Sequence, residues 1–361
     1  MIYFDNASTT SPITIPQLLH NPSSPHALGI KAERVLRQSR KTIAHILSSP
    51  SNQINPDEII FTSGGTESNN IAILGYVLTN TRHNINLMSS TFEHPSILAP
   101  IQFAHERNWA HKITWNNSPQ GPTLVFISHV NHETGDINDI SAISETIKKN
   151  NPVAIIFIDG AQGFCKEKIC LSNIDMYSFS GHKCHGPMGT GGLWVKKNLR
   201  LTPLFHGGGQ EGGKRSGTEN VPGIVQMAEA AESLHENLEA SHVHVTNIKS
   251  ATIRLKDLLP NVKVNSLGNH VSPYILNMSF LGLKGEILVH ALSEKGVYVS
   301  MGAACRSRKK AQPALELMGF TSEIAQSAIR FSFSPFNTLN EVEYARGIIV
   351  ETVTQLRRLI R

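Results

Sequence analysis

Short apolar stretches alternate with longer amphipathic stretches through the first two thirds of the chain, and this alternation constrains the fold more than any other feature. The apolar stretches lie at residues 58–63, 123–129, 153–159, 175–180 and 192–195. Helical spacing of apolar residues appears between them, at residues 31–47, 66–79 and 140–150. Continuous apolar runs of this length are typical of parallel strands buried on both faces. The pattern therefore predicts an α/β layered domain with a mostly parallel sheet flanked by helices.

The last third of the chain has a different pattern. One long helical stretch is predicted from Pro222 to about Leu259. After it, the sequence favours strands at residues 274–280, 297–300 and 329–333 and helices at residues 286–294 and 312–317. A chain of 361 residues is long enough for two hydrophobic cores. We therefore expect a second, smaller α+β domain at the carboxy-terminal end.

Composition argues against several classes of protein. The formal net charge is +5 and is spread along the chain, which suits an anionic cofactor or substrate better than the wrapping of nucleic acid. No stretch approaches the roughly 18 consecutive apolar residues of a membrane span. Residues 1–10 have neither the basic nor the apolar region of a secretion signal. The four cysteines are therefore expected to be free thiols in a reducing cytoplasm.

A glycine-rich turn follows the first predicted strand, at residues 62–68. Its glycines let the backbone turn sharply, and the next helix offers free N–H groups to an anion. Thr66 could add a hydroxyl to a bound phosphate. The alternative is an ordinary strand-to-helix turn with Thr66 as the N-cap.

Two ionisable residues end later strands. Asp159 ends an apolar strand, where a carboxylate is costly unless it meets a partner. A protonated pyridine nitrogen is such a partner; a helix N-cap or a metal ligand is the alternative. Lys183 follows residues 175–180, where desolvation would favour the neutral amine that Schiff-base formation requires, although a surface lysine is the alternative. Ser180 and His182 flank Lys183 and could reach a phosphate.

Residues 207–218 form a second glycine-rich stretch with two partial nucleotide motifs. Three of its glycines fit G-x-G-x-x-G, and part of it nearly fits a P-loop. No convincing apolar strand precedes it, and Arg215 stands where a P-loop requires Ser or Thr. Both nucleotide interpretations are therefore rejected. The remaining interpretation is a glycine loop that presents Thr218 to a phosphate, on its own or a neighbouring subunit.

The cysteines divide into one candidate nucleophile and three others. Cys305 lies among small residues and is followed by the basic run 306–310, whose charges favour the nucleophilic thiolate. A buried structural cysteine is the alternative, and the basic flank argues against it. The cluster at residues 182–185 lacks a second ligand pair at metal spacing, so no zinc site is expected. The remaining cysteines are interpreted as packing residues: Cys165, Cys170 and Cys184.

In their order along the chain, these stretches resemble the cysteine desulfurase family of fold-type I pyridoxal phosphate (PLP) enzymes, in its NifS/IscS-like branch of the class V aminotransferase group. Each motif is weak alone, but the ordered set is specific and covers nearly the whole chain. The resemblance implies a large domain with a seven-stranded sheet, residues 14–255, and a small domain, residues 1–13 with 256–361, which carries Cys305. The matching segments are Tyr3–Thr10, Asn21–His26, Thr62–Asn69, Glu93–His94, Asp159–Gln162, Ser178–Gly186, Arg215–Thr218, Ala304–Cys305 and Ala328–Ser332.

The resemblance also implies a role for each motif. Lys183 would hold PLP as a Schiff base and remove the substrate's Cα proton, and Cys305 would take sulfur from L-cysteine as a persulfide. His94 would stack on the cofactor's ring and help proton transfer. The phosphate would be bound by Gly65, Thr66, Ser180 and His182, joined by Thr218 from the other subunit of a homodimer. The ring would also contact Asp159 and Gln162, and the substrate would meet Asn21 and Arg330.

The chain departs from the family pattern at two places. His132 stands where the family usually has an asparagine that touches the cofactor's ring hydroxyl. Histidine also donates a hydrogen bond, but it is larger and titrates near neutrality. The basic run 306–310 follows Cys305, where the family usually has small neutral residues. In the family this loop delivers sulfur to a partner protein, so the basic run puts the usual acceptor in doubt. The acceptor is expected to be either an iron–sulfur scaffold or a tRNA-thiolation relay.

The sequence therefore predicts a PLP-dependent cysteine desulfurase, cytoplasmic and homodimeric, with no metal site, no direct nucleic-acid contact and no membrane contact. A selenocysteine lyase or an aminotransferase of the same fold is an alternative, as is a non-catalytic scaffold or regulator. Cys305 favours sulfur transfer, because transamination needs no thiol nucleophile.

Overall fold

The computed structural model describes residues 2–7, 20–115, 121–266, 268, 270–301 and 314–360. Contacts divide the chain into two compact units. The sheet unit comprises Ser11–His129 and Asn138–Glu236, and the terminal unit comprises Met1–Thr10, Val130–Ile137 and Asn237–Arg361. This division places residues 130–137 and 237–255 in the terminal unit, whereas the domain limits 14–255 and 1–13 with 256–361 remain a prediction.

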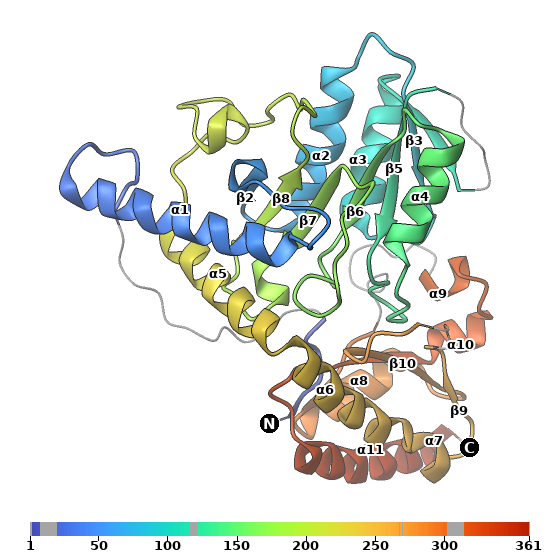
Figure 1. Cartoon of the computed structure of the whole chain (residues 1–361). Coiled ribbons are helices and arrows are strands. Elements are labelled where there is room, and N and C mark those ends of the chain that lie inside the picture. Colours follow the sequence, from blue (N-terminus) through green and yellow to red (C-terminus); the bar gives the residue numbers. More distant parts are fainter. Residues whose placement is uncertain are drawn as a thin grey trace. The chain divides into compact units, whose positions relative to one another are not determined.

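The sheet unit is built on seven strands in the order β2-β8-β7-β6-β5-β3-β4 (Figure 1). Only β8 among them runs antiparallel to its neighbours, β2 and β7. The predicted α/β architecture with a mostly parallel seven-stranded sheet is therefore confirmed. The strands are β2 (Ile59–Thr62), β3 (Asn86–Ser89), β4 (His111–Thr114), β5 (Thr123–Ser128), β6 (Ile155–Asp159), β7 (Met176–Ser180) and β8 (Gly191–Val195).

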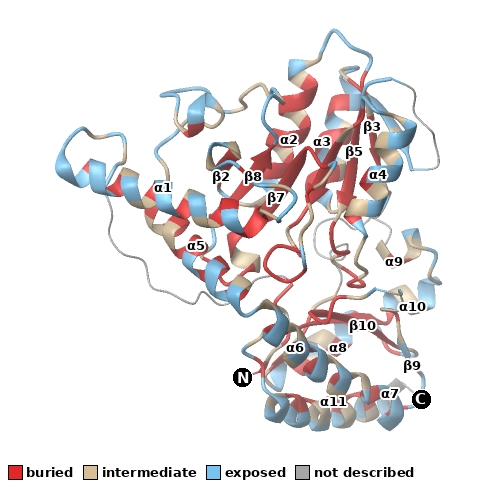
Figure 2. Ribbon diagram, in the orientation of Figure 1, coloured by how far each residue is buried: buried red, intermediate tan, exposed pale blue. Residues whose placement is uncertain are grey.

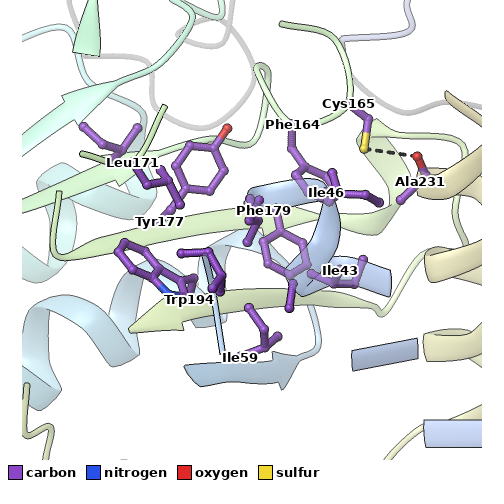
Figure 3. Packing of buried hydrophobic residues seen from close by; sticks show 14 of the residues in the cluster. Ile43, Ile46, Ile59, Phe164, Cys165, Leu171, Tyr177, Phe179, Trp194 and Ala231 are labelled. Carbon is purple, nitrogen blue, oxygen red and sulfur yellow. Dashed lines mark hydrogen bonds between the residues drawn. The ribbon is translucent and has the colours of Figure 1, made fainter. Parts of the chain in front are cut away.

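Helices cover both faces of this sheet, and its central strands are buried (Figure 2). Successive side chains of a strand point to opposite faces. Leu124 of β5 therefore packs in one cluster with Ile71 of α2, while Val125 packs in another with Ile43 of α1. The second cluster is drawn in Figure 3. The helices are α1 (Ala27–Leu47), α2 (Gly65–Thr79), α3 (Pro95–Glu106), α4 (Ile140–Asn150) and α5 (Val221–Glu236), with one-turn helices η1 (Pro56–Glu58), η2 (Gly181–Lys183) and η3 (Glu211–Gly213).

The terminal unit holds a three-stranded antiparallel sheet, β12-β10-β9, and a parallel pair of β1 with β11. It is the α+β unit expected for the end of the chain. Its strands are β1 (Ile2–Tyr3), β9 (Val262–Val264), β10 (Ile275–Phe280), β11 (Val297–Tyr298) and β12 (Ala328–Ser332). Its helices are α6 (Leu238–Ile253), α7 (Leu255–Leu258), α8 (Gly285–Glu294), α9 (Ala314–Leu317), α10 (Ser322–Gln326) and α11 (Leu339–Ile360).

The prediction of a single long helix over residues 222–259 is wrong, because this stretch contains the three helices α5, α6 and α7. The chain leaves helical geometry at Asn237, where φ is −104° and ψ is 15°, so that α5 ends and α6 begins there. A second break separates α6 from α7 at Arg254. Asparagine competes with helical hydrogen bonding through its own side chain, which favours a helix boundary at Asn237. Among the described residues, no helix has both the length and the apolar character needed to cross a membrane.

Candidate active site

The polar strand ends singled out in the sequence meet at one edge of the sheet. Ser128 of β5 pairs with Asp159 of β6, and Asp159 pairs with Ser178 of β7. On the other side of β7, Gly191 of β8 pairs with Ser180 and also with Thr62 of β2. Parallel strands place their carboxyl ends at the same edge, which is where open α/β sheets bind ligands.

The turn between β2 and α2 is shaped to receive an anion. Its N-cap residue is Gly64, whose φ of 151° favours glycine. The alternative in which Thr66 is the N-cap is therefore wrong, because Thr66 already lies in the first turn of α2. A glycine N-cap supplies no side chain to the first N–H groups of the helix, which leaves those groups available to a bound phosphate.

Ser180 places a hydroxyl group at the same turn. Its Oγ is buried and has no hydrogen-bond partner among the described residues. A Cβ placed on Gly65 would lie 3.6 Å from the Cβ of Ser180, so the serine and the start of α2 are neighbours. Buried hydroxyls nearly always have a partner. The phosphate of PLP fits this cradle because it would supply acceptors to Ser180 and to the helix N–H groups.

Asp159 is held by neutral donors. Its Oδ1 accepts from the Ala161 N–H at 3.0 Å and its Oδ2 accepts from Asn69 Nδ2 at 3.0 Å. The side chain is buried, and a buried carboxylate with neutral partners is costly unless a cation also meets it. The protonated ring nitrogen of PLP fits this position.

Asn69 links three other elements to Asp159. Its Oδ1 accepts from Ser178 Oγ at 2.7 Å, and its Nδ2 also donates to Ser96 Oγ at 2.8 Å. The residue is almost fully buried, so these hydrogen bonds are shielded from water. Asn69 was not predicted as a site residue. The only signal was its place one turn beyond Thr66 on the same helix.

His94 is the N-cap of α3 and is fixed by the same network. Its Nδ1 accepts from the Ser96 N–H at 3.1 Å and lies 2.7 Å from Ser96 Oγ. An Nδ1 that accepts a hydrogen bond places the ring proton on Nε2 in the neutral form. Ser96 therefore connects His94 to Asn69 and, through it, to Asp159. The stacking of His94 on the cofactor remains a prediction.

Glu93 is a buried acid that the sequence analysis did not single out as titratable. Burial raises its pKa to about 7, against hydrogen bonds from Ser128 and Ser90 that lower it, and the charge of Asp159 raises it further. Its Oε1 accepts from Ser90 Oγ at 2.9 Å, and its Oε2 accepts from Ser128 Oγ. Glu93 is therefore a buried carboxyl whose pKa lies well above that of an exposed glutamate.

Lys183, His182 and Gln162 follow the strand ends directly. Lys183 is half-buried in η2, the turn after β7. Burial, and then the charges of Lys183 and Lys166, lower the pKa of His182 to about 4, so its ring is neutral at physiological pH. Gln162 is buried, and its Oε1 accepts from Lys166 Nζ at 3.3 Å. A neutral imidazole keeps one donor for a phosphate oxygen.

Two ion pairs hold the loop that carries Thr218. Arg215 Nε lies 2.8 Å from Glu67 Oε1, one residue after Thr66. Glu211 pairs with Arg40 of α1 at 2.7 Å. Thr218 itself is exposed at the end of the loop. The loop is thus tied to the first turn of α2, while Thr218 faces solvent.

The predicted substrate residues lie partly in the terminal unit. Arg330 of β12 is buried there, and its Nη1 donates to the His132 carbonyl oxygen at 2.7 Å, while its Nη2 lies 3.5 Å from Asp5 Oδ1. The His132 ring lies 3.5 Å from Glu133 Oε1. Asn21, in the sheet unit, is exposed and accepts from the Ser23 N–H. Cys305 and the basic run after it lie outside the described residues.

The cysteines of the sheet unit differ in burial. Cys165 and Cys184 are buried in the core cluster that also holds Val125, as their interpretation as packing residues requires. Cys170 is half-buried. In the described part of the chain, no group of three or more His, Cys, Asp or Glu side chains is arranged to hold a metal ion.

Comparison with known proteins gives matches over nearly the whole chain. Residues 2–345 match the family model described as aminotransferase class-V. A protein of Lactobacillus delbrueckii subsp. bulgaricus, described as a NifS/IcsS protein homolog, is 36% identical over 372 residues, with 95% of this chain and 94% of that protein covered. The cysteine desulfurase IscS of Buchnera aphidicola subsp. Schizaphis graminum is 33% identical over 391 residues, with 99% and 94% covered.

Solved structures give the same picture. A NifS-like protein superposes with a TM-score of 0.89 at 30% sequence identity, covering 98% of this chain and 99% of that one. A structure of SspA in complex with cysteine superposes with a TM-score of 0.77 at 29% identity, covering 94% and 100%.

Proposed function

Because the chain belongs to the class V aminotransferase family and to its NifS/IscS-like cysteine desulfurases, we propose that it is a PLP-dependent enzyme that converts L-cysteine to L-alanine and passes the sulfur on through Cys305. The observation that carries the proposal is the meeting of three features at one sheet edge. These are Lys183 in its turn, Asp159 without a charged donor among its hydrogen bonds, and the uncapped start of α2 beside Ser180.

The residues assigned to the cofactor fit its chemical groups. Lys183 would bond its aldehyde carbon, Asp159 would pair with its ring nitrogen, and His94 would stack on the ring. Its ring hydroxyl would meet Gln162 and His132. Its phosphate would be held by Gly65, Thr66, Ser180 and His182, with Thr218 from a second subunit. When bound, PLP supplies an electron sink that acidifies the Cα–H bond of an amino acid.

The chain's own groups would then bind the substrate and move its protons. Arg330 would hold the carboxylate of L-cysteine through paired N–H donors, and its contacts with Asp5 and the His132 carbonyl orient it. Asn21 would lie near the substrate. The Lys183 amine would take and return the Cα proton. The Cys305 thiolate, favoured by the basic run 306–310, would accept the sulfur.

The finer assignments belong to the same proposal. An exposed Thr218 supports a homodimer in which each subunit completes the other's phosphate site. The complex of SspA with cysteine supports L-cysteine as the substrate. An iron–sulfur scaffold or a tRNA-thiolation relay would receive the sulfur, and a cytoplasmic location stays a prediction. A selenocysteine lyase, an aminotransferase and a non-catalytic scaffold are the alternatives.

Mass spectrometry after exposure of the holoprotein to L-cysteine tests the proposal. We expect one extra sulfur atom on Cys305, alanine in solution, and a pyridoxyl group on Lys183 after borohydride reduction. A Cys305→Ser variant should lose sulfur transfer, and a matched Cys170→Ser variant should keep it. Equal sulfide release by the Cys305→Ser variant and the parent protein would exclude the role of Cys305.

A further inference from the structure

A buried carboxylate that the proposed reaction does not use lies in the glycine-rich loop 207–218. Glu211 is part of η3, and only 1% of its side chain is exposed. Arg40 of α1 binds both of its carboxylate oxygens, from Nη2 to Oε1 at 2.7 Å and from Nη1 to Oε2 at 2.8 Å. Paired hydrogen bonds of this kind add a fixed geometry to the attraction between the charges. The loop is therefore held to α1 in one defined way.

The same pair of residues covers the free edge of β2. This strand stands last in the order of the sheet and pairs with β8 on one side only. On its other side, the Phe61 N–H donates to Glu211 Oε2 at 2.8 Å. Arg40 Nη1 donates to the Ile59 carbonyl oxygen at 2.6 Å. Backbone groups at the edge of a sheet stay unpaired unless something covers them, so Glu211 and Arg40 take the place that a further strand would have.

The backbone at Glu211 has an uncommon conformation. Its φ is 51°, and Gly212 and Gly213 follow with φ values of 62° and 77°. Glycine adopts this left-handed region readily, whereas glutamate rarely does. Strain of this kind persists only where surrounding contacts hold it, and it is concentrated at functional sites. Here the contacts with Arg40 and β2 hold it, and they turn one carboxylate of a largely exposed loop inward.

Gln210 connects this anchor to the end of the loop. Its Oε1 accepts from the Gly217 N–H at 2.9 Å, seven residues further along the chain. Thr218 follows Gly217 directly and is exposed. Because Gln210 is the neighbour of Glu211, an anchored Glu211 also fixes the backbone that presents Thr218.

We infer that Glu211, held by Arg40, is a positioning residue for the phosphate of the cofactor and that it acts through Thr218. The inference rests on the proposed function, in which Thr218 completes the phosphate site of a second subunit. The Glu211 oxygens bind Arg40 and the Phe61 N–H, so the effect of Glu211 on the phosphate is indirect. Loss of the anchor releases the Thr218 hydroxyl from its place, while the groups that meet the ring of PLP stay as they are.

Two substitutions remove the anchor in different ways. Glu211→Gln removes the charge with little change in size, and the new amide nitrogen cannot accept from Arg40 or from the Phe61 N–H. Arg40→Lys keeps the positive charge but has no paired donors, and it replaces Glu211→Gln in every comparison if the latter does not fold. Glu33→Gln is the matched control, because it removes the same charge from an exposed ion pair with Arg37 on α1.

Equilibrium dialysis of the whole chain against PLP, and separately against pyridoxal, which lacks the phosphate, tests the inference without any measure of activity. Glu211→Gln and Thr218→Ala should each weaken PLP binding by about 10-fold, the loss expected for one hydrogen bond to a charged group. Arg40→Lys should weaken it too. None of them should change the binding of pyridoxal, and Glu33→Gln should bind both compounds as the parent protein does. A substitution that only loosened the edge of the sheet would weaken the binding of both compounds alike.

A double variant shows whether Glu211 acts through Thr218. If it does, Glu211→Gln combined with Thr218→Ala should bind PLP no more weakly than Thr218→Ala alone, because contacts that act through each other are not additive. The inference would be overturned by additive losses, by equal losses for PLP and pyridoxal, or by parental PLP binding of Glu211→Gln beside a weakened Thr218→Ala. Parental PLP binding of Thr218→Ala would instead refute the assignment of Thr218 in the proposed function, and the inference would fall with it.

Discussion

Substitution of Asn69 should destabilise the candidate site, because its small side chain makes three buried hydrogen bonds there. The Asn69→Ala substitution removes the donor to Asp159 Oδ2, the donor to Ser96 Oγ and the acceptor for Ser178 Oγ. All of these groups are buried, so bulk water does not replace the lost hydrogen bonds directly.

The magnitude follows from the charges of the partners. A hydrogen bond to a charged group contributes about 1.5–3 kcal/mol and a neutral one about 0.5–1.5 kcal/mol. One charged and two neutral hydrogen bonds together give a loss of roughly 2.5–6 kcal/mol in the free energy of unfolding. Non-additivity within one network favours the lower half of this range.

Urea denaturation of the apoprotein, followed by circular dichroism, measures this loss without the contribution of bound PLP. Asn70→Ala is the matched control, because Asn70 is partly exposed on the same helix and bonds only to the Thr66 carbonyl oxygen one turn back. It should change the free energy of unfolding by no more than about 0.5 kcal/mol. If Asn69→Ala fell within that margin too, the network would not stabilise the sheet edge and the reasoning would be refuted.

Three further predictions use the same measurement. Folding raises the pKa of Glu93 from 4.5 to about 7, so between these pH values the folded protein binds more protons than the unfolded chain. The free energy of unfolding should therefore fall by roughly 3 kcal/mol as the pH rises from 4.5 to 7. Glu93→Gln should remove this pH dependence. Burial lowers the pKa of His129 from 6.5 to about 4, so between these pH values the unfolded chain binds more protons than the folded protein. The free energy of unfolding should therefore fall by about 3 kcal/mol as the pH drops from 6.5 to 4. A His129→Asn variant with the same pH dependence of stability as the parent protein would contradict this. A Cβ on Gly163 would lie 2.3 Å from His129 Nδ1, so Gly163→Ala should cost about 1–3 kcal/mol, whereas Gly347→Ala, with open space around it in α11, should be neutral or stabilising by up to about 1 kcal/mol.

The sheet was predictable wherever a strand is apolar along its whole length. β5 and β6 are buried almost throughout, and their runs of Ile, Val and Phe leave few other structures open. β3 and β4 were not predicted, because Asn86–Ser89 and His111–Thr114 are short and mix polar with apolar residues. Their strand geometry comes from pairing with β5 and with each other, which no local pattern reveals.

The sequence predicted which polar residues follow the strands of the site, but it did not predict the hydrogen bonds that connect them. Lys183 and Asp159 carry their signal in the sequence, because each is an ionisable group after an apolar strand. The hydrogen bonds of Asn69 join residues of α2, α3, β6 and β7, so they depend on tertiary packing.

The reversed strand β8 has a consequence for how closely the site is built. Its first residue, Gly191, lies so close to the turn between β2 and α2 that a Cβ there would be 2.6 Å from Gly64 Cα. One added methyl group would therefore displace the main chain of this turn, which is proposed to hold the phosphate, although it would alter no charge and no hydrogen-bond donor. Which substitutions this edge tolerates therefore depends first on the distance between two backbone segments, and only then on the charge or hydrogen bonding of the new side chain.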